Sequence, residues 1–233
     1  MERWPIWLAP PPALAILKRY ELSLPSRYNI DGALTVSDTL ADYFRSTGFP
    51  AEKILPIYYG YDSNLFKFRA PEAWDSRRAP VIVMHGSLDH HHLGDVALGA
   101  MQRVMREIPN AIFRFVGHKT VALNAFLKRA REHVPESQLQ TTGFIQYSEI
   151  AQHLHSADVG IVPYEESTGT HCAFVAKIVE YLAVGLPVVS TSINSAARYF
   201  AAEPTVKFAG FDGVRFGEAI LQTLQSPIPN LAE

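Results

Sequence analysis

The fold is decided by residues 176–190, whose sequence is AKIVEYLAVGLPVVS. Apolar residues recur at helical spacing as far as Val184, as on one face of an amphipathic helix. Gly185 and Pro187 are typical of a helix end. The apolar run that follows them is typical of a strand buried on both faces. A helix that leads through a tight turn into such a strand indicates a parallel α/β sheet.

The same alternation extends outward through the chain from residue 79. Short apolar runs predict strands at residues 80–85, 112–116, 139–142, 159–162, 187–190 and 205–208. Stretches of helical period between them predict helices at residues 93–107, 121–133, 148–156, 173–184, 195–201 and 213–225. Ser148 is expected to cap the third of these helices. The pattern predicts a Rossmann-like, doubly wound parallel sheet with its ligand crevice at the carboxyl ends of the strands.

The first third of the chain has a different organisation. Its periodicity predicts helices at residues 13–22 and 38–47 and strands at residues 32–36 and 53–58, followed by an irregular charged stretch. Two helices and two strands are too few to close a core. We therefore expect residues 1–66 to be a remnant of an N-terminal α/β domain that exposes apolar surface. We expect residues 67–78 to be a linker and residues 79–233 to be the C-terminal domain.

Composition narrows the classes of protein. Hydrophobic residues make up 48% and charged residues 19% of the chain, which excludes a disordered tail or a coiled coil. The net charge of -2 argues against a nucleic-acid partner. Cys172 is the single cysteine, so no intramolecular disulfide can form and a cytoplasmic location is expected. Trp4 and Trp7 suit either the inner face of a membrane or contact with a neighbouring domain.

Lys177 and Glu180 are the polar residues of interest in the deciding stretch. Three positions apart on a helix, they share a face. A carboxylate beside the crevice of such a sheet can accept two ribose hydroxyls, as the acidic residue of dinucleotide folds does. The same spacing also suits a solvated ion pair. Spacing alone favours the ion pair over the ribose contact.

Four segments, in this order, resemble motifs of one protein family. They are residues 33–40 (ALTVSDTL), 53–66 (KILPIYYGYDSNLF), 157–164 (ADVGIVPY) and 176–189, the last resembling P-x-K-x-x-E-Y-L-A-x-G-x-P-V-V. The chain is similar to the C-terminal, nucleotide-sugar-binding half of retaining glycosyltransferases of family 4, which have the two-domain GT-B fold, with a truncated N-terminal domain.

The resemblance implies a site for a nucleoside-diphosphate sugar. Glu180 would hold the ribose hydroxyls, and Lys177, one helical turn before it, would approach the diphosphate. Gly86 and Ser87, after the first strand of the C-terminal domain, would let the backbone approach the phosphates or the sugar, since glycine has no side chain.

Two further loops complete the implied site. Phe144 and Ile145 would border the base. Thr168 and Gly169 would offer backbone N–H groups at a helix N-terminus, where the helix dipole favours an anion. The resemblance implies no cofactor besides the donor and no requirement for a metal ion.

The chain departs from the family pattern at two places. Cys172 occupies the position of the first acid of an E-x7-E pair that ends at Glu180. The segment GSLDHHH at residues 86–92 has no match for the arginine and lysine that usually grip the diphosphate. Most catalytic groups would belong to the N-terminal domain, so the sequence assigns no catalytic residue.

Three other motifs have ordinary interpretations. His90, His91 and His92 are adjacent and therefore point in different directions, and no second cluster has metal-ligand spacing. Cys172 beside His171 is expected to be a small, half-buried residue, because a thiol and its base are paired in space and seldom in sequence. Glu165 and its neighbouring glutamate are expected to lie in a solvated loop.

Two functions remain open. The first is a transferase that moves a sugar from a nucleoside-diphosphate donor to a hydroxyl of a glycan or lipid-linked acceptor in polysaccharide biosynthesis. The second is a non-catalytic nucleotide-sugar-binding module or split-enzyme subunit, whose partner is a separate N-terminal-domain chain or a second copy of this chain. A nucleotide-sugar epimerase ranks lower, because it needs acid and base groups in a cleft between two whole domains.

Overall fold

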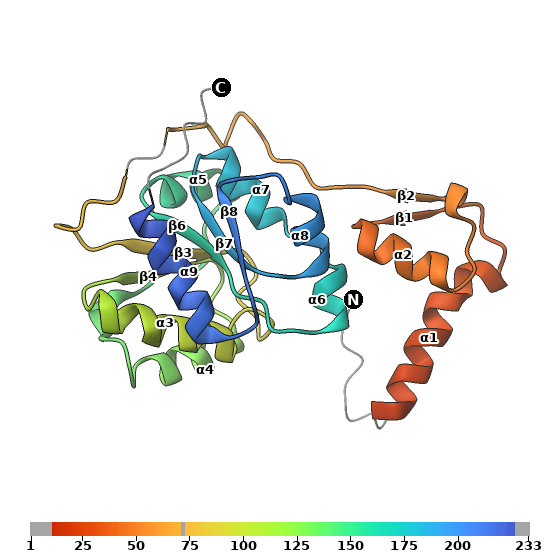
Figure 1. The fold of residues 1–233 in the computed structure, drawn as a ribbon, viewed down its shortest axis with the longest axis horizontal. Helices are drawn as coiled ribbons and strands as arrows, with labels where there is room; N and C mark the ends of the chain where they lie inside the picture. The colour runs from red at the N-terminus through yellow and green to blue at the C-terminus, as the bar shows by residue number, and fades with distance from the viewer. Residues whose placement is uncertain (1–10, 71–72, 227–233) are drawn as a thin grey trace.

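The computed structural model describes residues 11–70 and 73–226 and contains a larger and a smaller sheet (Figure 1). The larger sheet has six parallel strands in the order β5-β4-β3-β6-β7-β8. Their bounds are Val81–His85 (β3), Ile112–Val116 (β4), Leu139–Thr141 (β5), Val159–Val162 (β6), Val188–Thr191 (β7) and Val206–Ala209 (β8). This is the doubly wound order, in which the direction of winding reverses between β3 and β6. The predicted fold class is confirmed.

Helices cover both faces of this sheet (Figure 1). One face carries α3 (Asp95–Glu107), α4 (Val121–Ala130) and α9 (Gly213–Gln225), and the other carries α5 (Tyr147–His155), α7 (Ala176–Ala183) and α8 (Asn194–Tyr199). The side chains of β3 alternate between the two cores. Ile82 and Met84 pack with the first group, whereas Val83 packs with the second. A strand with both faces buried is largely apolar, which explains the nearly continuous apolar runs of the sequence.

Several predicted helix boundaries differ from the structure. The helix expected at residues 173–184 begins only at Ala176 (α7), because Ala173 has an extended backbone and its carbonyl accepts a hydrogen bond from Ser195 Oγ, and a separate short helix, α6 (Thr168–Cys172), precedes it. Helix α5 begins at Tyr147, so Ser148 is not its cap. The Glu149 carboxylate accepts the Gln146 N–H at 2.8 Å and closes that N-terminus instead. Single turns of 3-10 helix lie at Ala51–Lys53 and Glu136–Gln138.

The smaller sheet lies in the first third of the chain. Its elements are α1 (Pro11–Arg27), β1 (Ala33–Thr35), α2 (Asp38–Ser46) and β2 (Ile54–Pro56), and the two strands pair in parallel. One face of the sheet packs on α2 through a small core that includes Ala41 and Ile54. The opposite face is bare, since the paired residues Leu34 and Leu55 are 70% and 59% exposed. The expected exposed apolar surface is therefore present.

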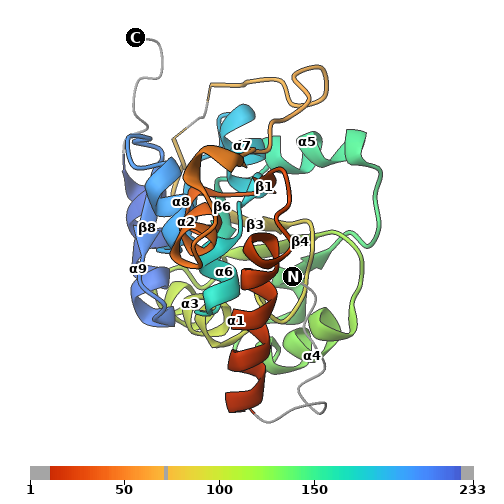
Figure 2. The ribbon, with the colours of Figure 1, turned by 90° about the vertical axis from the view of Figure 1, so that its right-hand side faces the viewer.

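The first third contacts helices α6 and α8, beside which it lies in the side view (Figure 2). Ser37 Oγ donates to the carbonyl of Cys172 at 2.6 Å, and Arg198 pairs with Asp42 at 2.9 Å. Part of the stretch predicted as a linker also packs on the larger domain, since Trp74 lies against the hydrophobic core that includes residues of α3 and α9. No helix among residues 11–70 and 73–226 combines the length and the apolar character needed to cross a membrane.

Candidate functional site

Helix α7 is held on the sheet by buried side chains. Ile178 and Tyr181 are fully buried, and the Tyr181 hydroxyl accepts the His85 N–H at 3.2 Å. The Tyr181 ring lies where a side chain at Gly160 of β6 would stand, 2.7 Å from an ideal Cβ. Glycine therefore allows this close approach. The result is that Lys177 and Glu180 lie at the carboxyl end of β3, at the reversal point where doubly wound sheets bind ligands.

The Glu180 carboxylate is held by two protein donors. Its Oε2 is 2.5 Å from Nε2 of His85, and its Oε1 accepts the hydroxyl of Tyr147 at 2.7 Å. Burial by itself would raise the pKa of Glu180, but the hydrogen bonds from His85 and Tyr147 and the charge of Lys177 outweigh it, so the pKa is lowered. The carboxylate is thus ionised, and each oxygen keeps a lone pair for a further donor.

His85 is a neutral donor to this carboxylate. Its side chain is buried, and burial lowers its pKa, although the hydrogen bond to Glu180 acts in the opposite direction. A neutral imidazole carries one N–H, and Nε2 must bear it to face a carboxylate. Nδ1 then carries a lone pair, and it has no hydrogen-bond partner among the residues that the structure describes.

Lys177 lies beside the loop that follows β3. Its Nζ is 2.6 Å from Nε2 of His92 and 3.4 Å from the carbonyl of Ser87. Gly86 has a φ of +90°, and a Cβ there would be 3.0 Å from Lys177 Cε. The structure therefore brings together Gly86, Ser87, Lys177 and Glu180, four of the residues that the sequence singled out.

The remaining predicted residues surround this centre. Phe144 is 79% exposed, and Ile145 packs partly against the core under α5 and α7. Their loop leads into Tyr147, which joins it to Glu180. Thr168 and Gly169 are exposed at the start of α6, a helix of five residues.

Sequence reasoning missed four residues of the site. They are His85, Asp89, His92 and Tyr147. A usable signal existed only for His85, since a histidine that ends an otherwise apolar buried strand needs a polar partner.

Two other expectations concern residues near the site. Glu165 does not lie in a solvated loop, because its Oε1 accepts the Val96 N–H at 2.9 Å in the first turn of α3. Cys172 is buried, and burial raises the pKa of its thiol, which disfavours the reactive thiolate. No three side chains of His, Cys, Asp or Glu gather into a possible metal site within residues 11–70 and 73–226.

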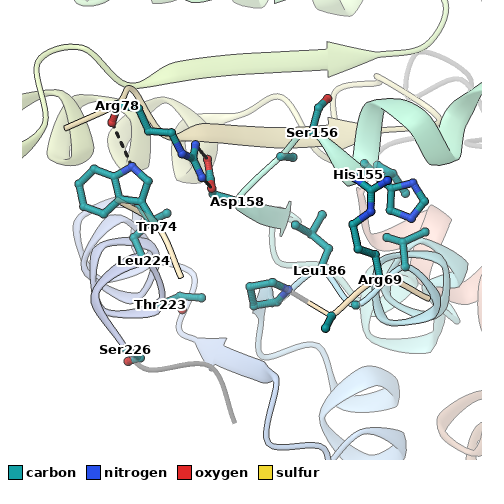
Figure 3. A pocket seen from close by; sticks show the side chains of 16 residues that line it. Arg69, Trp74, Arg78, His155, Ser156, Asp158, Leu186, Thr223, Leu224 and Ser226 are labelled. Carbon is teal, nitrogen blue, oxygen red and sulfur yellow. Dashed lines mark hydrogen bonds and ion pairs between the residues drawn. The ribbon is translucent and has the colours of Figure 1, made fainter. Parts of the chain in front are cut away.

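A separate cavity of about 280 Å³ lies at the opposite edge of the sheet (Figure 3). Its lining includes Arg78, Asp158 and Pro187, which precede β3, β6 and β7. Arg78 pairs with Asp158 there, and Trp74 Nε1 donates to the carbonyl of Arg78 at 3.1 Å. Ligands of doubly wound sheets bind at the carboxyl ends of the strands, so this cavity at the amino ends is not the expected ligand site.

Solved structures of glycosyltransferases share this fold. HepE of Anabaena, solved with UDP and glucose, is 17% identical, with a TM-score of 0.68 over 89% of this chain and 57% of that one. Sucrose-phosphate synthase of Thermosynechococcus elongatus is 19% identical, with a TM-score of 0.70 over 91% of this chain and 52% of that one. The chain thus spans little more than half the length of these structures, and the likeness shows the GT-B fold.

Sequence comparisons indicate the family. TuaH of Bacillus subtilis (strain 168), a glycosyltransferase assigned to teichuronic acid biosynthesis, is 35% identical over 57 residues, which are 24% of this chain and 14% of that protein. A family model described as "Glycosyl transferases group 1" matches residues 79–226, well over half of the chain. The chain therefore belongs to the group 1 glycosyl transferase family.

Proposed function

We propose that this chain binds a nucleoside-diphosphate sugar at the carboxyl end of β3, in the transfer of its sugar to an acceptor hydroxyl during polysaccharide biosynthesis. One observation carries the proposal: Glu180, an ionised carboxylate with free lone pairs, lies next to Lys177 at the reversal point of a doubly wound sheet. The family match supports it, as does the fold shared with HepE, which was solved with UDP and glucose.

The donor site would work by positioning and electrostatics. Each oxygen of Glu180 would accept one ribose hydroxyl through the lone pair that His85 and Tyr147 leave free. Lys177 and backbone N–H groups beside Gly86 would neutralise the diphosphate, and the loop at Phe144 would border the base. Stabilising the departing diphosphate in this way is electrostatic catalysis, and the proposed mechanism assigns that task to these groups, with no resident metal.

The proposed acceptor is a glycan or lipid-linked hydroxyl, and a second α/β domain would bind it. The bare face of the smaller sheet is the place where that domain would dock, because parallel sheets are normally covered on both faces. Leu34 and Leu55 would then be buried. The occupant that we propose for this face is the acceptor-binding domain, and a dimer of this chain is the alternative that light scattering tests. We also propose a cytoplasmic location, which the single cysteine of the sequence supports, and peripheral contact with the inner membrane face.

A second candidate is a non-catalytic binding module that holds the nucleotide sugar for a partner. The observation that favours it is Cys172, a buried cysteine at the position where the family carries an acid. Without that acid, one contact to the sugar is absent. The site would then retain the ribose and diphosphate contacts of Glu180 and Lys177 alone.

Calorimetric titration separates these functions. The chain is titrated with UDP-glucose, GDP-mannose and ADP-glucose, and product formation is measured with a hydroxyl acceptor present. Binding with turnover supports the transferase, whereas binding that gives no turnover even when the acceptor-binding domain is added supports the module. Absence of binding for all three nucleotide sugars would refute both. Light scattering of the same sample tests whether the bare face forms a dimer.

A further inference from the structure

His92 joins Lys177 to a carboxylate that lies on the other side of the imidazole ring. Nδ1 of His92 is 2.9 Å from Oδ1 of Asp89, and Nε2 is 2.6 Å from Nζ of Lys177. The imidazole is 3% exposed, and its ring lies 4.2 Å from the ring of Tyr164. Three titratable side chains thus form one hydrogen-bonded row beside the loop of Gly86.

The direction of each hydrogen bond follows from charge. Hydrogen bonds from His92 and His91 lower the pKa of Asp89 although burial opposes them, so Asp89 is an ionised acceptor. Nδ1 of His92 must then carry the proton. Burial and the charge of Lys177 lower the pKa of His92 to about 4, so Nε2 keeps its lone pair and accepts a proton of the Lys177 ammonium.

Within this row, one N–H group of the Lys177 ammonium is left without an acceptor. An ammonium has three N–H groups. One is directed at His92, and a second at the carbonyl of Ser87. The third remains for a ligand beside Gly86, where the absence of a side chain leaves room.

We propose that Asp89 and His92 are positioning residues that hold Lys177 for the diphosphate, so that binding of a nucleotide sugar is coupled to uptake of a proton by Lys177 from solvent. This inference rests on the proposed function, because it assigns the diphosphate to Lys177. The proton is added to Nζ, and the two negative charges of the bound diphosphate then stabilise the resulting ammonium.

The burial of Lys177 makes this coupling measurable near neutral pH. Burial lowers the pKa of Lys177 to about 7, although the charges of Asp89 and Glu180 oppose the shift. In the free protein the ammonium is therefore lost as the pH rises through 7. The bound diphosphate raises the pKa, so affinity is highest below pH 7 and falls above it by up to about tenfold per pH unit. The titratable groups around Lys177 are His85, Asp89, His91, His92, Tyr164 and Glu180.

The test is calorimetry with UDP-glucose, GDP-mannose and ADP-glucose in buffers of different ionisation enthalpy at pH 6, 7 and 8. Their diphosphates are doubly esterified and do not titrate here, so proton uptake reports the protein. We expect uptake to approach about one proton at pH 8 and to vanish at pH 6. Lys177→Arg keeps the charge but cannot titrate in this range, so its uptake should be absent.

Two variants of His92 test its part in the row. His92→Phe keeps a ring against Tyr164 but has no lone pair, and we expect its affinity at pH 7.5 to fall about tenfold. His92→Gln offers an amide oxygen to Lys177 and should recover most of the loss. Thermal unfolding checks that both variants are folded. The measurement of proton uptake by the unmodified chain does not depend on either variant.

The outcomes distinguish this inference from the proposed function. Two results would refute the positioning of Lys177 by Asp89 and His92 while leaving the proposed donor site intact. They are binding without proton uptake, and binding by His92→Phe as tight as by the unmodified chain. If none of the three nucleotide sugars binds at any pH, the proposed function is refuted, and the positioning role of Asp89 and His92 is refuted with it. The inference is supported if Lys177→Arg abolishes proton uptake and if His92→Gln recovers the affinity that His92→Phe loses.

Discussion

Replacing the Glu180 carboxylate tests the donor site most directly. In Glu180→Gln the amide oxygen can still accept the His85 N–H, and the amide nitrogen can donate to the Tyr147 oxygen, so both contacts of the folded state survive. What disappears is the charge that would face the ribose. Hydrogen bonds to charged groups contribute about 1.5–3 kcal/mol. We therefore expect nucleotide-sugar affinity to fall by roughly 10- to 150-fold.

The assay is calorimetric titration with the nucleotide sugar that the unmodified chain binds. The matched control is Glu136→Gln, which removes the same charge from an exposed glutamate paired with Arg131, away from the crevice. The control should bind like the unmodified chain. If Glu180→Gln binds equally tightly while its thermal unfolding is unchanged, the carboxylate does not hold the ribose and the reasoning fails.

Three further predictions concern the surroundings of the site. Gly86→Ala adds a side chain at positive φ, 3.0 Å from Lys177 Cε, and should cost about 1–3 kcal/mol in urea unfolding; an unchanged midpoint would contradict the strain. Asp158→Asn weakens the pair with Arg78 and the acceptor of the Val81 N–H, and should cost about 1–3 kcal/mol without changing nucleotide-sugar affinity, since it lies at the other edge of the sheet. Leu34→Lys should reduce self-association and dye binding in light-scattering and fluorescence measurements at little cost in stability; association equal to that of the unmodified chain would show that another surface is responsible.

The larger sheet was predictable because its strands are buried on both faces. Such strands are largely apolar, so the central ones appear as nearly uninterrupted runs, as in β3, where only His85 at the end is polar. The division between α6 and α7 was not predictable. The helical period of the sequence extends back to Ala173, but α7 begins only at Ala176, because the packing of Phe174 against Tyr58 and the hydrogen bond from Ser195 to the Ala173 carbonyl hold the preceding residues out of the helix.

Some residues of the candidate site were also predictable from the sequence, and others were not. Lys177, Glu180 and the glycine turn at Gly86 could be located from the sequence, because the resemblance to the glycosyltransferase motifs implied their place at the crevice of the sheet. The partners of Glu180 could not, since His85 lies 95 positions away in the chain and Tyr147 lies 33 positions away. His92 resembled part of a metal-like histidine run until its place between Asp89 and Lys177 was visible.

By itself, the sequence determined the alternation of strand and helix, the parallel sheet and the edge at which we propose that the ligand binds. These follow from local periodicity and from the rule that connects consecutive parallel strands. Only the tertiary structure decided which side chains share hydrogen bonds, and hence which groups are charged. Protonation depends on burial and on neighbours brought together from distant parts of the chain, and no local pattern records those contacts.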